Sequence, residues 1–548
     1  MTRHRHDTTV PAPASGAAAP SDWLLLPGFL ALFALAAALR WPWLAGDLNT
    51  LVRDVVPDDA FYYFEVCVRL WRGEGVTFDG VEPATGFHLL WLCVILPFFR
   101  NAAAGDPAPV RAALWLATFL HVAAALCLYR INLRALGRRA PAALLCLAFT
   151  LNLFVLRESL NGLETALSVF LLCLFLNVMA WYWEAPGARR AAWLAAVVAG
   201  CILARTDNAV VLLPPCLLLL RPDTRALRDA ALVAGAAFGA LAVILCFTWL
   251  STGGLLQSSA AAVPWVVRDR WLAAHPDASA FDLFLMGLRH IPGGLIKVAR
   301  ASGAAASVAG FGSVLAAAVL LCARRPAVSP ALRRALWLVV LFAAGLAALH
   351  AAHGVFRWMN RAYYFAAWPL LFFTAPAIIW AALAGPHRNR ALSAALTVWL
   401  AVGAVTLAAG YHGVLAGQYP WQEETVGAAA LLDRLLPPDE PVGAFNAGIL
   451  GYCSARPVVN LDGVVNETAA RQIRQRRLAD YLHGRGLRYL LDSPAMWGET
   501  WYFAGLDRHF HPDGAPLRHS VVAEFDLEGV GWPDAGHGMQ LIGVGDNP

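Results

Sequence analysis

Long apolar runs dominate the pattern of hydrophobic and polar positions along this chain. Several reach the roughly 20 residues that a helix needs to cross a bilayer core. The two runs that flank Arg205 and Asp207 are shorter, so they are expected to be tilted, broken or partly buried in protein. We therefore predict a mainly α polytopic membrane protein with about eleven transmembrane helices. The runs cover 22–45, 110–130, 141–156, 163–183, 191–204, 208–220, 229–250, 305–323, 335–350, 363–383 and 392–412.

The composition supports a membrane protein and excludes several other classes. Of 548 residues, 59% are hydrophobic and only 14% are charged, and the mean hydropathy is +0.55, far from the usual composition of a soluble protein. The ten cysteines contain no CxxC pair, which indicates neither a zinc site nor a disulfide framework. Arginines in short connections account for the net charge of +5, so nucleic acid is not an expected partner.

Clusters of arginine occupy every second connection between the apolar runs. Cytoplasmic loops collect positive charge, so this alternation predicts a cytoplasmic N-terminus and an extracytoplasmic C-terminus. This topology requires that the thirteen-residue run 87–99 does not cross the membrane, and we predict that run to be a short helix at the outer leaflet. Residues 1–21 are predicted to be a disordered cytoplasmic tail. The clusters are Arg3 and Arg5; Arg130, Arg134, Arg138 and Arg139; Arg189 and Arg190; Arg221, Arg225 and Arg228; Arg324, Arg325, Arg333 and Arg334; Arg388 and Arg390.

Ordinary polarity returns after the last apolar run, and 413–548 is predicted to form an extracytoplasmic α/β domain. A basic helix is expected from about Asn466 to Leu482. The segment GAFNAGILGY lacks both GxGxxG and a Walker lysine, so a tight turn is favoured over a nucleotide site. The turn NLDGVVN, with Asp462 and Asn466, is a candidate to face the active site. Strands are expected at 441–446, 457–462, 487–492, 520–526 and 539–544.

The first extracytoplasmic loop, 46–109, contains two adjacent aspartates, Asp58 and Asp59, at the start of DDAFYYFEVCVRLW. Apolar residues recur there at helical spacing, which predicts an interfacial amphipathic helix lying along the membrane. One aspartate caps a helix well, but two exceed what a cap needs, so at least one is expected to be functional. His88, at the start of the next helix, either has a structural role or contacts a polar head group.

The motif DDAFYYF…G.G.TFDG..PATGFHLLW, with LNGLETAL, LARTDNAVVL and VGAFNAGILGY…VVNLDGVVN, resembles the bacterial polytopic GT-C glycosyltransferases. The resemblance implies a GT-C-like transmembrane domain over 22–412 in the bacterial inner membrane. It also implies transfer of a sugar from a polyprenyl-phosphate donor to a glycan, lipid or protein acceptor on the extracytoplasmic face. The family's catalytic acid lies in the first loop and corresponds to Asp58 or Asp59. This chain departs from the family at Ala84-Thr85-Gly86, where TNG is usual, and at Gln257, where proline is usual.

An inverting transfer of this kind needs one base and several cations. A carboxylate deprotonates the acceptor hydroxyl while charge builds on the leaving phosphate. Asp58 is the candidate base, with Asp59 close behind it. Lys297 is the only lysine in a chain that otherwise uses arginine, which suggests a site that needs a compact charge. Arg357 and Arg361 lie four residues apart, on one face if helical, and are either phosphate partners or interface anchors. The predicted substrate-binding residues are His88, Arg205, Lys297, Arg357 and Arg361.

Carboxylates at the outer ends of apolar runs are costly unless they are paired or hydrated, so they are functional candidates. With oxygen ligands they would suit a divalent cation, Mg²⁺ or Mn²⁺. The alternative is internal pairing, of Asp207 with Arg205 and of Glu158 with Arg157. The predicted metal set is Asp58, Glu158, Glu164 and Asp207.

A transporter or flippase of lipid-linked sugars is the alternative function. Such proteins usually contain internal repeats and bind their substrate near the membrane midplane. This sequence has no convincing repeat, and its charged residues gather at one face. A glycosyltransferase is therefore the favoured prediction.

Overall fold

The structure is a computed structural model of the whole chain. It describes residues 25–220, 223–279, 281–282, 285–286, 288–289, 292–293, 295–296, 303–323, 329–353, 362–383, 389–494, 507–525 and 538–545. The predicted tail 1–21 lies outside the described residues, as do Lys297, Arg357 and Arg361.

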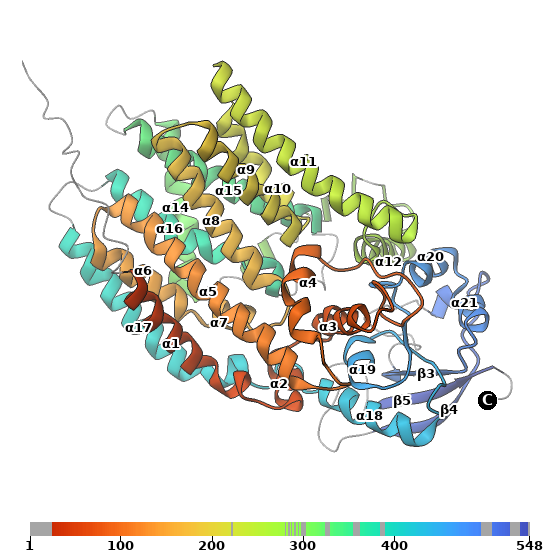
Figure 1. Cartoon of the computed structure of the whole chain (residues 1–548). Coiled ribbons are helices and arrows are strands. Elements are labelled where there is room, and N and C mark those ends of the chain that lie inside the picture. Colours follow the sequence, from red (N-terminus) through yellow and green to blue (C-terminus); the bar gives the residue numbers. More distant parts are fainter. Residues whose placement is uncertain are drawn as a thin grey trace, which may run out of the picture.

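The membrane domain contains a helix for each of the eleven predicted apolar runs (Figure 1). Seven helical segments in the described part of the chain are long and apolar enough to cross a membrane, and several apolar helices are shorter. The protein is therefore a multi-pass membrane protein. The eleven helices are α1 (Leu25–Leu44), α5 (Pro107–Leu136), α6 (Arg139–Thr150), α8 (Thr165–Glu184), α9 (Ala188–Ala204), α10 (Asn208–Cys216), α11 (Thr224–Thr252), α14 (Ala304–Cys322), α15 (Pro330–His353), α16 (Trp368–Leu383) and α17 (Asn389–Leu415).

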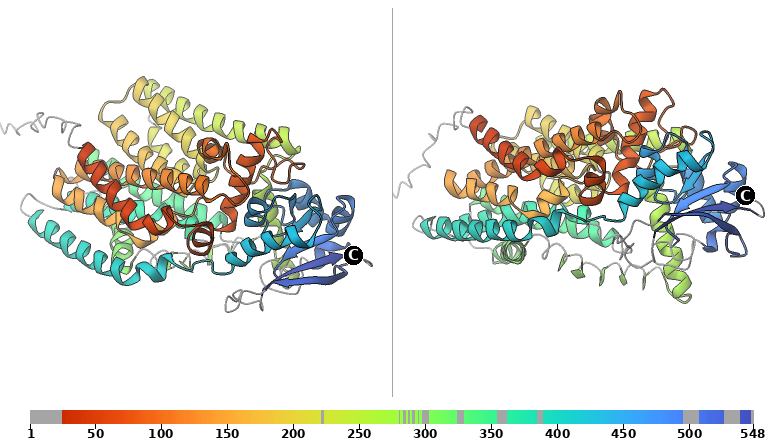
Figure 2. Two further views of the ribbon diagram at one scale, coloured as in Figure 1. Left: turned by 60° about the horizontal axis from the view of Figure 1, so that its bottom comes forward. Right: turned by 90° about the horizontal axis from the view of Figure 1, so that it is seen from below.

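These helices pack side by side as a bundle, and the C-terminal domain lies at one end of it in every view (Figure 2). Helix α5 packs on α1, α6, α8 and α16, while α9 packs on α11 and α10 on α15. Small residues permit close approach within a membrane domain. At Gly345 on α15, an added Cβ would overlap the backbone of Val211 on α10, so these two helices touch backbone to backbone.

The segment between α1 and α5 folds into short helices at the same end of the bundle. Its elements are α2 (Leu48–Asp54), α3 (Asp58–Trp71), α4 (Leu89–Ile95) and the 3₁₀ helix η2 (Leu96–Phe99). The predicted helix at Asp58 is present, but its predicted interfacial surroundings are wrong. Every residue from Ala60 to Arg69 is buried, because the C-terminal domain and α4 cover the faces that the sequence pattern assigned to lipid and water.

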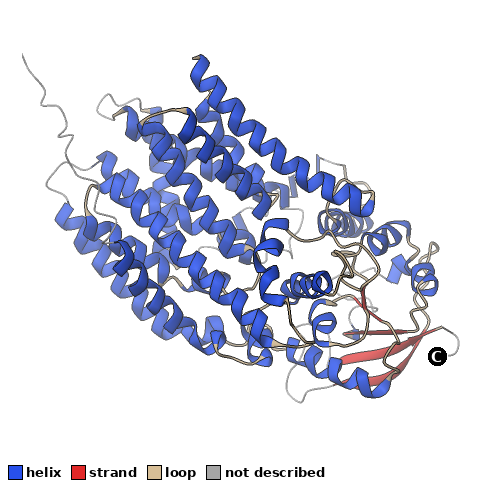
Figure 3. Cartoon of the chain, viewed as in Figure 1, coloured by secondary structure: helices blue, strands red, loops and turns tan. Residues whose placement is uncertain are grey.

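The C-terminal domain carries the strands of the described chain (Figure 3). Its five-stranded sheet has the order β2-β1-β3-β5-β4. β1 pairs in parallel with β2 and β3, and β5 pairs antiparallel with β3 and β4. The elements are α18 (Gln422–Leu435), β1 (Val442–Ala444), α19 (Gly448–Cys453), β2 (Val458–Asn460), α20 (Glu467–Gln475), α21 (Leu478–Gly484), β3 (Tyr489–Asp492), α22 (Asp507–Phe510), β4 (His519–Phe525) and β5 (Met539–Val544).

All five predicted strands are present, whereas the single helix predicted from Asn466 to Leu482 is wrong. The chain forms two helices there, α20 and α21, because Arg476 adopts a left-handed conformation with φ 57°. That conformation ends α20 and redirects the chain. The predicted domain start at 413 falls in the last turn of α17.

Ion pairs and hydrogen bonds attach the first loop to the C-terminal domain. Arg485 on the loop after α21 donates to Asp79 at 3.0 Å, and Thr468 on α20 donates to Glu82 at 2.9 Å. At Gly86 an added Cβ would overlap the carbonyl of Val464. The loop and the domain therefore form one packed unit around the site.

Candidate active site

A cavity of about 370 Å³ lies between the membrane bundle and the C-terminal domain. This volume is within the range of roughly 300–1,000 Å³ that is typical of ligand sites. Its described lining residues are Asp59, Tyr62, Tyr63, Gly86, Phe87, His88, Leu163, Glu164, Arg205, Thr206, Asp207, Ile244, Leu245, Leu255, Leu256, Gln257, Ser259, Ala260, Val263, Pro264, Tyr363, Tyr364, Asn446, Asp462 and Val464.

The walls of this cavity differ in polarity. The wall contributed by α11, α12 (Ser258–Ala274) and the segment between them is mainly apolar. Leu255 and Leu256 on this wall are 66% and 59% exposed, so the apolar lining continues onto the outer surface of the protein. The wall contributed by α3 and the C-terminal domain is polar, with Asp59, Asn446 and Asp462. The cavity can therefore accept a ligand with an apolar end and a polar end.

Asp59 belongs to the cavity. It lies in the first turn of α3, and the hydroxyl of Tyr363, from the 3₁₀ helix η4 (Ala362–Phe365), donates to its Oδ2 at 3.3 Å. Among the described residues that line the cavity, Asp59 is present and Asp58 is absent. The geometry therefore distinguishes the two aspartates and favours Asp59 at the cavity, where the sequence put Asp58 slightly ahead.

Asp58 is turned toward the C-terminal domain. Its Oδ1 accepts from the amide of Ile449 at 2.7 Å and its Oδ2 accepts from the amide of Gly448 at 3.1 Å. Burial raises the pKa of Asp58 to about 7, although these two amides favour the charged form. An added Cβ at Gly448 would overlap the Asp58 carbonyl, so only glycine allows this approach. Asp58 thus holds α19 against α3.

Four backbone amides at the turn in the segment GAFNAGILGY are bound by the protein's own carboxylates. Those of Phe445 and Asn446 donate to Asp492 Oδ2 at 2.9 and 2.8 Å, and those of Gly448 and Ile449 donate to Asp58. A nucleotide phosphate at this turn would have to displace these groups. The geometry agrees with the favoured prediction of a tight turn.

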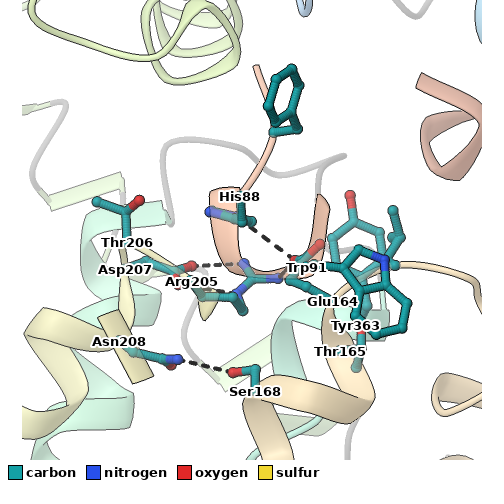
Figure 4. Close-up of polar contacts among 12 residues, drawn as sticks. His88, Trp91, Glu164, Thr165, Ser168, Arg205, Thr206, Asp207, Asn208 and Tyr363 are labelled. Carbon is teal, nitrogen blue, oxygen red and sulfur yellow. Dashed lines mark hydrogen bonds and ion pairs between the residues drawn. The ribbon is translucent and has the colours of Figure 1, made fainter. Parts of the chain in front are cut away.

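Arg205 lies at the centre of an ion-pair network on the cavity wall (Figure 4). Its guanidinium donates to Glu164 at 2.6 Å and to both oxygens of Asp207 at 3.0 and 2.7 Å. Asn208, next in the chain, donates to Ser168 on α8 at 2.9 Å, which fixes the turn between α9 and α10. The charge of Arg205 is therefore matched by two carboxylates of the protein itself.

His88 adjoins this network. Its Nε2 lies 3.7 Å from Glu164, and its backbone amide donates to the hydroxyl of Tyr63, which in turn donates to Glu164 at 2.8 Å. Burial, the largest cause, lowers the pKa of His88. The imidazole is therefore neutral near pH 7, so His88 acts as a hydrogen-bonding group rather than a cation.

The four predicted metal ligands do not converge. Glu158 pairs with Arg157 at 2.7 Å and borders a separate small cavity, while Asp58 binds α19. Glu164 and Asp207 do meet, but on Arg205. The pairs Asp207–Arg205 and Glu158–Arg157 are the two that the sequence offered as the alternative, whereas the pairing of Glu164 with Arg205 was not predicted. In the described part of the chain, no group of three or more His, Cys, Asp or Glu residues could hold a metal ion. These residues do not fit the predicted cation.

The C-terminal domain contributes polar groups that the sequence only partly predicted. Asp462 faces the cavity as expected, whereas Asn466 caps α20 by accepting from Ala469 at 3.0 Å. Asn446 was missed, because its motif read only as a turn. Gln257 stands where the resembling family usually has proline, and its side chain joins two parts of the cavity wall. It donates to the Phe87 carbonyl at 2.6 Å and accepts from Thr206 at 3.1 Å.

The arrangement of the bundle, the structured first loop and the C-terminal domain is the GT-C fold. Three complexes of the oligosaccharyltransferase from the archaeon Archaeoglobus fulgidus share it. The complex with Zn and sulfate has a TM-score of 0.55 at 15% identity, over 93% of this chain and 72% of that chain. The complex tethered with an acceptor peptide containing the NVT sequon has a TM-score of 0.54 at 13% identity, over 95% and 74%. The complex with an inhibitory peptide and a dolichol-phosphate has a TM-score of 0.51 at 13% identity, over 88% and 71%.

Sequence comparison adds one match. Residues 415–536 match a family described as a domain of unknown function, DUF8728. That segment begins at the end of α17 and includes most of the C-terminal domain. No curated protein sequence matches this chain.

Proposed function

We propose that this protein is a membrane glycosyltransferase that moves a sugar from a polyprenyl-phosphate donor to an acceptor hydroxyl. The observation that carries the proposal is the cavity, which joins an apolar wall open at Leu255 and Leu256 to a polar wall containing Asp59. A lipid-linked sugar has these two ends. The oligosaccharyltransferase of the same fold, with its bound dolichol-phosphate, supports this donor class.

Asp59 is the base in this proposal. Its carboxylate takes the proton of the acceptor hydroxyl as that oxygen attacks the anomeric carbon, and the bond from that carbon to the phosphate oxygen breaks. The phosphate leaves with the bonding electron pair and stays on the lipid. Attack opposite the leaving group inverts the anomeric centre. The hydroxyl of Tyr363 holds the carboxylate of Asp59 in place.

The amino end of α12 is the proposed position of the donor phosphate. Gln257, Ser259 and Ala260 line the cavity there, and the amide groups at a helix N-terminus favour an anion. Arg205 and its ion-pair partners Glu164 and Asp207 line the same cavity. Lys297, Arg357 and Arg361, outside the described residues, remain the proposed cations for the phosphate.

The proposed orientation places the N-terminus in the cytoplasm and the cavity on the extracytoplasmic side of a bacterial inner membrane. The arginine clusters in alternate connections support it. Single cysteines placed in the 185–187 turn and in the C-terminal domain of a cysteine-free variant would test it. A membrane-impermeant maleimide added to intact spheroplasts should label only the second.

Transfer is tested with purified protein in lipid nanodiscs and a panel of undecaprenyl-phosphate sugars. The wild type should consume at least one donor, and Asp59→Asn should slow that reaction by about 100- to 10,000-fold. Asp480→Asn is the matched control, because this carboxylate is 67% exposed on α21. Full activity of Asp59→Asn would refute the base assignment. A wild type that moves labelled lipid across a vesicle but consumes none would favour the transporter.

A further inference from the structure

Two polar side chains of the C-terminal domain face the same cavity as Asp59. Asn446 follows β1 and Asp462 follows β2. These strands are parallel neighbours, so the two residues lie beside each other at the carboxyl edge of the sheet. That edge is the usual ligand-binding edge of a parallel sheet. Here it is turned toward the membrane domain.

The position of Asp462 is fixed by its own turn. Its Oδ1 accepts from the amide of Val464 at 2.8 Å, and its side chain is buried, with 7% of the residue exposed. Gly463 has φ +78° and packs against Ala470, leaving no room for a Cβ. The carboxyl of Asp462 is therefore held rigidly at the cavity surface.

Asn446 is oriented by Asp492. Its Nδ2 donates to Asp492 Oδ1 at 3.0 Å, and its backbone amide donates to Asp492 Oδ2 at 2.8 Å. An amide whose nitrogen is bound in this way directs its oxygen elsewhere as an acceptor. Asn446 and Asp462 together thus offer oxygen acceptors to a cavity ligand.

The ligand that suits these groups has several hydroxyl groups. Each hydroxyl of a sugar can donate to an amide or carboxyl oxygen and can also accept a hydrogen bond. Burial, with the nearby charges of Asp59 and Asp58, raises the pKa of Asp462 to about 8. Near neutral pH the Asp462 carboxyl therefore carries a proton that it can donate. Two sugar hydroxyls at this position would meet that one donor and the acceptor oxygens of Asp462 and Asn446.

We propose that Asp462 and Asn446 form a subsite that binds sugar hydroxyl groups and positions that sugar beside Asp59. This inference rests on the proposed transfer function. The two residues are positioning residues, since Asp59 alone receives the proton. The sugar belongs either to the lipid-linked donor or to a glycan acceptor.

Binding measurements separate these two sources. Native mass spectrometry should give the affinity of the wild type for undecaprenyl phosphate and for undecaprenyl-phosphate sugars. If the donor sugar occupies the subsite, Asp462→Asn and Asn446→Ala should weaken binding of the sugar-bearing lipid by about tenfold and leave the sugar-free lipid unchanged. If the acceptor occupies it, both lipids should bind normally, while the KM for an oligosaccharide acceptor rises more than kcat falls.

The controls distinguish loss of the subsite from loss of the fold or of the function. Asp480→Asn should behave as wild type, and each variant should still unfold in a single cooperative thermal transition. In the wild type the affinity for the sugar should weaken above about pH 8, and Asp462→Asn should remove that dependence. Normal lipid affinity, KM and kcat in both variants would overturn the subsite. A wild type that binds neither lipid would instead overturn the proposed function.

Discussion

Asp58 accepts a hydrogen bond from the amide of Ile449 at 2.7 Å, and the two residues are 391 positions apart in the chain. The amide of Asp58 also donates to Gln422 at 2.8 Å, and Gln422 donates to the carbonyl of Val56 at 2.9 Å. The start of α3 is therefore bound from two elements of the C-terminal domain. Asp59, one residue further along, owes its position to these contacts.

Asp58→Asn should weaken the attachment of the C-terminal domain. The amide side chain has only one acceptor oxygen for two backbone donors, and leaving a buried donor without an acceptor costs about 1–3 kcal/mol. The melting temperature in detergent should fall. Limited proteolysis between α17 and α18 should become faster.

Asp59→Asn provides the contrast to this variant, since it should keep the wild-type melting temperature while losing transfer activity. If Asp58→Asn melts like the wild type but loses all activity, the roles assigned to the two aspartates are reversed.

Gly86→Ala should destabilise the contact between the first loop and the C-terminal domain. The added methyl would meet the Val464 carbonyl, which is backbone and cannot rotate away, and such overpacking costs about 1–3 kcal/mol. Thermal unfolding measures the loss. Gly427→Ala on α18 is the control, because a Cβ there meets nothing within 4 Å and alanine favours the helix.

Arg205→Gln should be strongly destabilising. It removes the guanidinium that binds Glu164 and Asp207 at the cavity wall, and breaking a buried ion pair costs about 3–5 kcal/mol. Combining it with Glu164→Gln should recover part of the loss, which a double-mutant cycle would measure.

Arg477→Gln serves as the reference for that cycle, since its pair with Asp480 is more than half exposed on both sides. Exposed pairs contribute at most about 1 kcal/mol. Equal effects of the two arginine substitutions would contradict the central role of Arg205.

Asp58 and Asp462 should each make the protein less stable as the pH rises from about 4 to about 8. Burial raises the pKa of Asp58 to about 7 and that of Asp462 to about 8, whereas the unfolded chain releases these protons near pH 4. Between these limits the folded state binds more protons, so rising pH favours unfolding. Melting temperatures across this range should show the slope, and Asp462→Asn should reduce it. An unchanged slope in that variant would contradict the raised pKa.

The sequence predicted the membrane helices and the strands well because each depends on local pattern. A helix in lipid needs a long apolar run, and short runs such as 441–446 and 539–544 alternate with turn signals. Apolar runs and turn signals can be recognised in the sequence without knowledge of tertiary contacts.

The surroundings of α3 and the full lining of the cavity were not predictable in this way. They depend on contacts such as that of Asp58 with Ile449, which leave no periodic signal in either segment. The predicted metal set failed for a related reason. The sequence shows acidic residues at helix ends but not which groups they face. In the structure Glu164 and Asp207 both bind Arg205.

The strand order has a consequence for how the protein is made. β5 lies between β3 and β4 although it follows both in the chain, so the sheet cannot close until residues 539–544 have been synthesised. Asn446 and Asp462 are held by that sheet and its turns, and they complete the cavity. A ribosome-bound chain that has already inserted its membrane helices and exposed Asp59 therefore still lacks one wall of its cavity, and that wall is completed only after residues 539–544 have been added.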